Sequence, residues 1–130
     1  MKQLLSTFWH NVVMCLLFCL YSNHILAQCT APTNFQATAV AGTNTNVVLS
    51  WSTVDGAFGY QIRVTNMVTN VTGTPILVTA ELTTQQSFIL EGLAPDQDYL
   101  IRIRTVCCQQ PTPTTTECFS PYVRTLAAAS

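Results

Sequence analysis

The stretch Leu93-Ala94-Pro95-Asp96-Gln97-Asp98-Tyr99-Leu100-Ile101-Arg102-Ile103 decides the fold of this chain. Its first half contains a proline and two aspartates, which are residues typical of tight turns. Its second half alternates in polarity, with Tyr99, Ile101 and Ile103 on one face, and this period predicts a half-buried β-strand over residues 99–106. Such a strand needs a second layer of structure to cover its apolar face.

The same alternation predicts six more short strands along the chain. They cover residues 35–39, 47–51, 60–64, 76–79, 87–90 and about 122–126, and turn-forming residues separate them. Seven short strands in about 100 residues predict an all-β, antiparallel sandwich of two sheets. The residues expected to face the core are Phe35, Ala37, Ala39, Val47, Leu49, Trp51, Tyr60, Ile62, Val64, Phe88 and Leu90.

The N-terminal segment, residues 1–27, is typical of a secretory signal peptide. Lys2 supplies a positive start, Val12–Leu20 supplies a short apolar core, and Ala27 offers a small residue at the cleavage position. A membrane anchor would need about 20 apolar residues, and the polar residues 22–24 interrupt the run. We therefore expect a secreted or cell-surface protein with no stable membrane span after cleavage.

Cleavage would leave a domain over residues 28–126. Ala127-Ala128-Ala129-Ser130 shows no core-forming pattern, so we expect residues 127–130 to be a tail or linker stub. Lipidation of Cys29 is an alternative to secretion, because Leu26-Ala27-Gln28-Cys29 resembles a lipobox. Such a box has a small residue before the cysteine, and Gln28 is not small, so we favour a disulfide role for Cys29.

The composition argues against nucleic-acid binding and catalysis. A formal net charge of −1 with 8% charged residues creates no strong field that would recruit nucleic acid. Lys2, His10 and His24 all precede the cleavage site, so the mature chain lacks the commonest general bases and Schiff-base nucleophiles. We predict that the chain is not an enzyme and holds no cofactor and no metal.

Three sequence features together resemble one family. Trp51 closes the second expected strand, Tyr60 opens the third, and Leu93–Tyr99 matches a Leu-x-Pro-x-x-x-Tyr signature. The chain resembles the fibronectin type III domain, of the kind found in secreted bacterial proteins, which often begin with Cys-x-x-Pro as at Cys29–Pro32. The resemblance implies a seven-stranded, immunoglobulin-like sandwich with Tyr99 in a tyrosine corner. It implies a structural core that contains Trp51, Tyr60, Leu93, Pro95 and Tyr99.

The mature chain has an even number of cysteines, namely Cys29, Cys107, Cys108 and Cys118. Four cysteines in an exported domain favour disulfides, with three possible connectivities. In the sandwich that the resemblance implies, all four lie at one pole. Cys107 shares the parity of the inward residues of its strand, so we favour Cys29–Cys107 and Cys108–Cys118. A zinc site is a poor alternative, because paired short spacings and histidine are missing.

Two surfaces are candidates for binding. Arg63, Arg102, Arg104 and Arg124 lie out of phase with the core residues, so the outer face of one sheet is expected to collect them for an acidic glycan or an acidic protein. A solvated face is the plainer alternative. The loop Gln109–Glu117, closed by a disulfide, could recognise a partner or serve as a spacer. Asn70-Val71-Thr72 is a glycosylation sequon at an expected loop tip.

These observations predict a secreted, non-catalytic β-sandwich module for adhesion, spacing, or protein or glycan binding at the cell surface. One alternative is an accessory module of a larger or fragmented secreted hydrolase. Another is a small ligand-binding or inhibitory protein that acts through the disulfide-closed loop. The expected partner is an extracellular protein or polysaccharide whose identity the sequence does not give.

Overall fold

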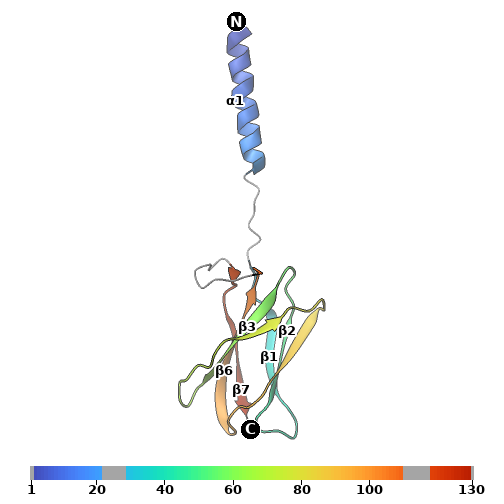
Figure 1. The fold of residues 1–130 in the computed structure, drawn as a ribbon, viewed down its shortest axis with the longest axis vertical. Coiled ribbons are helices and arrows are strands. Elements are labelled where there is room, and N and C mark those ends of the chain that lie inside the picture. Colours follow the sequence, from blue (N-terminus) through green and yellow to red (C-terminus); the bar gives the residue numbers. More distant parts are fainter. Residues whose placement is uncertain (1, 22–28, 110–117, 130) are drawn as a thin grey trace.

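The computed structural model describes residues 2–21, 29–109 and 118–129. At the N-terminus, α1 (Lys2–Tyr21) is an α-helix (Figure 1). Within the described residues, no helix combines the length and the apolarity that crossing a membrane requires. The expected cleavage position between Ala27 and Gln28 lies outside the described residues, as does most of the loop 109–117.

Seven strands in the described residues form two sheets (Figure 1). One sheet has the strand order β1-β2-β5 and the other has the order β4-β3-β6-β7. All neighbouring strands are antiparallel, which confirms the predicted fold class. The strands are β1 (Thr33–Ala39), β2 (Val47–Ser52), β3 (Gly59–Asn66), β4 (Ile76–Thr79), β5 (Gln85–Leu90), β6 (Gln97–Val106) and β7 (Val123–Ala129).

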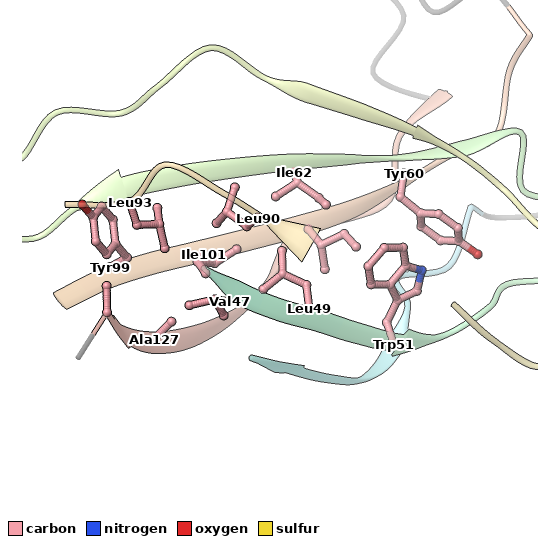
Figure 2. Close-up of a cluster of buried hydrophobic side chains, with 12 residues drawn as sticks. Val47, Leu49, Trp51, Tyr60, Ile62, Leu90, Leu93, Tyr99, Ile101 and Ala127 are labelled. Carbon is pink, nitrogen blue, oxygen red and sulfur yellow. The ribbon is translucent and has the colours of Figure 1, made fainter. Parts of the chain in front are cut away.

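The core lies between the two sheets and is built from alternate residues of the strands (Figure 2). Trp51 packs edge-on against Tyr60 with 5.2 Å between the ring centroids, and both side chains are almost fully buried. Val64, Phe88, Phe35 and Ala37 are only partly buried, and Ala39 at the end of β1 is exposed. The inward period of two therefore holds best in the middle of each sheet.

Each of the two core tyrosines uses its hydroxyl to bind a loop. The Ala94 N–H donates to Tyr99 Oη over 2.8 Å, and the Val54 N–H donates to Tyr60 Oη over 2.8 Å. The first bond is the backward contact that the tyrosine-corner resemblance implies. Leu93 is buried beside Tyr99, as Figure 2 shows.

The expectation that Pro95 belongs to the core is wrong, because its side chain is exposed. Pro95 occupies the turn between Leu93 and β6, and the next residue, Asp96, has a positive φ of 55°. A proline fixes its own φ and so restricts the turn. Its place in the signature is therefore explained by backbone geometry rather than by apolar burial.

The expectation of a tail beyond residue 126 is also wrong. The strand β7 continues to Ala129, where Ala127 and Ala129 are only 8% and 2% exposed. Ala127 lies opposite Tyr99 in the β6–β7 ladder, and the Asp96 N–H donates to the Ala129 carbonyl. Three consecutive alanines show no alternation between apolar and polar residues, so the sequence gives no sign of a strand here. The small side chain of Ala127 nevertheless fits beside the large ring of Tyr99.

Candidate functional site

Two disulfides lie at the pole where β6 ends. Cys29 is bonded to Cys107 and Cys108 to Cys118, with Cα–Cα distances of 5.9 and 5.0 Å. This is the pairing that the sequence analysis favours. The Cys107 N–H also donates to the Cys118 carbonyl over 2.8 Å. The bonds tie the start of the domain and the segment before β7 to the end of β6.

Hydrogen bonds, in addition to the disulfide, hold the short segment 118–122 against the end of β6. The Ser120 N–H donates to the Thr105 carbonyl over 3.0 Å, and the Thr105 N–H donates back to Ser120 Oγ over 2.8 Å. Phe119 forms an isolated antiparallel bridge with Val106. This anchoring places two aromatic side chains, Phe119 and Tyr122, beside the outer face of the four-stranded sheet.

Three arginines form one row across that outer face. Arg63 on β3 lies directly opposite Arg102 on β6, and Arg102 lies directly opposite Arg124 on β7. Neighbouring strands are about 4.8 Å apart, so three positive side chains project at close and regular intervals. Like charges that face each other across strands destabilise a sheet, so the row needs a compensating interaction.

Among the described residues, no carboxylate forms an ion pair with any of these arginines. The five described acidic side chains are all exposed, and four of them lie in loops. The buried Nε atoms of Arg63 and Arg102 make no hydrogen bond to any residue that the structure describes. The five acidic residues are Asp55, Glu81, Glu91, Asp96 and Asp98.

The Arg102 guanidinium lies 5.6 Å from the Tyr122 ring centroid, a cation–π contact that offsets part of the repulsion. Arg104 belongs to the same face and makes closer contacts. Its Nε–H donates to Gln61 Oε1 over 2.7 Å, and its guanidinium lies 3.7 Å from the Phe119 ring centroid and 4.6 Å from that of Tyr122. The Tyr122 hydroxyl donates to the same Gln61 oxygen over 3.0 Å. These contacts fix Arg104 by cation–π and hydrogen-bond interactions at the edge of the row.

Burial is the main influence on the pKa of Arg104. Desolvation lowers the pKa of its guanidinium, the electrostatic interaction with Tyr122 opposes that change, and the positive charge of Arg63 adds to it. A guanidinium is so basic that it stays protonated at neutral pH.

We call Arg63, Arg102, Arg104 and Arg124 the arginine face. The structure brings all four to the outer side of β3, β6 and β7. The predicted core residues Trp51, Tyr60, Leu93 and Tyr99 lie in the core between the two sheets. Sequence reasoning missed the supporting residues Gln61, Phe119 and Tyr122. Gln61 could have been found, because it shares the parity of Arg63. The two aromatics could not, since their position depends on the disulfide-anchored segment.

The arginine face can bind anions but offers no proton-transfer or nucleophilic chemistry of its own. A guanidinium donates two parallel hydrogen bonds to a carboxylate or a sulfate, and it does not lose its proton. Within the residues that the structure describes, no group of three or more His, Cys, Asp or Glu side chains is placed to hold a metal ion.

Comparisons with known proteins agree with this architecture. The model of the fibronectin type III domain matches residues 30–117. A structure described as a myokine is 17% identical, with a TM-score of 0.57, and covers 77% of this chain and 96% of its own. The fibronectin type III domain of human collagen alpha-1(XX) is 20% identical, with a TM-score of 0.55, and covers 82% and 90%.

A third solved structure, a computationally redesigned β-sandwich, is 25% identical, with a TM-score of 0.56, and covers 75% of this chain and 87% of its own. No curated protein matches the chain in sequence. The low identities show a shared fold and carry no ligand with them. The matched family model nevertheless spans well over half of the residues, and the two sheets have the expected order. The chain belongs to the fibronectin type III family.

Proposed function

We propose that the chain is an exported, non-catalytic binding module that acts outside the cell and recognises a negatively charged partner through its arginine face. The fibronectin type III domain is a β-sandwich module that is commonly non-catalytic and involved in binding. Residues 1–27 would direct export, and two disulfides suit an oxidising compartment. The Cys-x-x-Pro start at Cys29–Pro32 supports a place among secreted bacterial modules.

One observation carries the proposal. Arg63, Arg102 and Arg124 stand in one register across three strands, with no acidic partner among the described residues. Each exposed ion pair adds little by itself. A partner with several carboxylates or sulfates would relieve the repulsion between three neighbouring guanidinium groups at once. Binding would then be stronger than the sum of isolated contacts and would weaken with salt.

The test compares the mature wild-type chain with the triple variant Arg63→Ser/Arg102→Ser/Arg124→Ser. Affinities for heparin and for poly-L-glutamate are measured by calorimetry at low and at physiological salt. We expect the wild type to bind both polyanions, with an affinity that falls as salt rises. The triple variant should lose at least about tenfold in affinity, since each tenfold loss corresponds to only about 1.4 kcal/mol.

A matched control is available on the other sheet. Gln36, Thr38 and Ser87 are exposed on the outer face of β1 and β5, so Gln36→Glu/Thr38→Glu/Ser87→Glu lowers the net charge by the same three units. This control should keep most of the affinity if the arginine face is the site. Equal losses in the two variants would mean that only net charge matters. Equal loss, or no binding by the wild type, would contradict the proposal.

A further inference from the structure

Apolar side chains flank the arginine row on both sides, and from them we infer that the partner is a protein. The surface of this partner that contacts the arginine face would carry carboxylates next to apolar side chains. This inference rests on the proposed function, because it concerns the same face. It goes further by choosing one class of partner and by adding residues that an acidic polysaccharide would not need.

The first flank is a pair of leucines in the next row of the sheet. Leu100 precedes Arg102 by two residues on the outer face of β6, and it lies directly opposite Leu126 on β7. Leu126 is 65% exposed, and Leu100 is half-buried. Since residues two apart on a strand share a face, both leucines stand next to the guanidinium groups. A partner that reaches the arginines also touches these leucines.

The second flank lies on the other side of the row. Leu77 on β4 is directly opposite Gln61, the residue that holds Arg104, and its side chain is 68% exposed. Leu77 and the half-exposed Phe58 line a hollow of about 170 Å³. Gly59 also lines this hollow, and a Cβ atom there would lie 2.7 Å from the Val78 carbonyl oxygen, so glycine permits the close approach of β3 and β4.

The arginine face, taken together with its flanking leucines, has the residue composition of a protein–protein interface. Arginine and aromatic residues are enriched at the centres of interfaces, and lysine and glutamate are depleted there. This face combines four arginines with Phe119, Tyr122 and three leucines. A polysaccharide recognised through its charges would leave the exposed leucines in water. An apolar protein side chain beside a carboxylate would bury them, at about 25 cal/mol for each Å² removed from water.

The test uses two synthetic helical peptides of equal length and equal charge. In the first, glutamates alternate with leucines on one face, and in the second, serines replace the leucines. Heparin serves as the third probe. We expect the mature wild-type chain to bind the glutamate–leucine peptide about fivefold more tightly than the glutamate–serine peptide, which corresponds to about 1 kcal/mol. It should also bind that peptide more tightly than heparin of the same total charge.

The variant Leu77→Ser/Leu126→Ser should remove the preference for the leucine peptide while keeping the affinity for the serine peptide. Leu82 is fully exposed and lies between β4 and β5, away from the row, so Leu82→Ser is the matched control and should keep the preference. Thermal unfolding checks that each variant is folded.

The outcomes separate the two proposals. Equal affinity for the two peptides, or tighter binding of heparin than of either, would overturn the inference of a protein partner and leave the anion site intact. Binding of all three probes that is unaffected by Arg63→Ser/Arg102→Ser/Arg124→Ser would overturn the proposed function itself. Loss of the peptide preference in Leu82→Ser as well would also contradict the inference, because the flanking leucines would then have no special part.

Discussion

Arg102 is the residue at which stability and binding compete most directly. It faces Arg63 on one neighbouring strand and Arg124 on the other. Its buried Nε atom makes no hydrogen bond, which adds a desolvation cost to the repulsion. The guanidinium lies 5.6 Å from the Tyr122 ring centroid, which offsets part of this cost. Under the proposed function, a bound anion would offset the rest.

The variant Arg102→Met should therefore separate stability from binding. Methionine keeps most of the aliphatic stem that packs on the sheet, and the change removes the charge that lies between two others. We expect the free energy of unfolding to stay the same or rise by about 0.2–1 kcal/mol, while the affinity for poly-L-glutamate falls. Denaturant unfolding and calorimetry measure the two quantities.

A large loss of stability in Arg102→Met would contradict this account, since it would show that the charge is already compensated within the fold. The variant Gln36→Met is the control, because Gln36 is exposed on the other sheet and lies in no charged row. It should change neither quantity by more than a few tenths of a kcal/mol.

Single residues also show where sequence reasoning stops. Trp51, Tyr60 and Tyr99 could be assigned to the core, because large aromatic side chains stand out in an alternating pattern. Pro95 was assigned to the core wrongly, because the signature alone does not distinguish a proline that packs in the core from one that shapes the turn. Ala127 and Ala129 were missed, because a methyl group contributes little to any hydrophobic period.

At the scale of elements, the second disulfide and the arginine face form one unit. Cys108–Cys118 anchors the segment that carries Phe119 and Tyr122, and these rings lie against Arg104. The first disulfide, Cys29–Cys107, ties the start of the domain to the end of β6 instead. The two disulfides lie at the same pole, but we expect Cys108–Cys118 to support binding and Cys29–Cys107 to support stability.

Removing each bond separately should show this difference. Cys108→Ser/Cys118→Ser should weaken poly-L-glutamate binding about threefold or more, because Arg104 loses its aromatic support, with a moderate loss of stability. In the wild type, the Cys29–Cys107 disulfide closes a much longer loop than Cys108–Cys118 does. The variant Cys29→Ser/Cys107→Ser should therefore lose about 2–5 kcal/mol of stability. Its affinity, measured well below the unfolding temperature, should stay close to that of the wild type.

The opposite pattern, in which only Cys29→Ser/Cys107→Ser lowers the affinity, would contradict the assignment of roles. Mass spectrometry without reduction confirms which pair remains bonded in each variant. The sequence could predict the sharing of one pole, because strand order brings the four cysteines together. It could not predict the contact between the segment 118–122 and Arg104, which depends on how that segment packs.

For the whole molecule, alternation was sufficient to predict two antiparallel sheets, because each strand must bury one face against the other layer. Register is the property that sequence alone could not supply. A shift of two residues between β3 and β6 would keep every core residue inside and would still separate Arg63 from Arg102. The sequence could therefore predict which arginines share the outer face. It could not predict that Arg63, Arg102 and Arg124 lie directly opposite one another.

Export is the second property of the whole molecule. If residues 1–27 are removed as proposed, the protein recovered outside the cell should begin at Gln28, which N-terminal sequencing or intact mass measures. Chains in which Ala27→Arg blocks cleavage should keep the leader. A wild-type product that starts at Met1, or a lipid attached to Cys29, would contradict the proposed processing.

The most direct measurement of the central claim follows the guanidinium groups themselves. In a chain labelled with ¹⁵N-arginine, the Nε–H signals of Arg63, Arg102, Arg104 and Arg124 are recorded by NMR while poly-L-glutamate is added. The account predicts that the signals of Arg63, Arg102 and Arg124 shift together along one saturable curve, and that added salt reverses the shifts. Unchanged arginine signals, with shifts confined to the backbone of the loops, would contradict it.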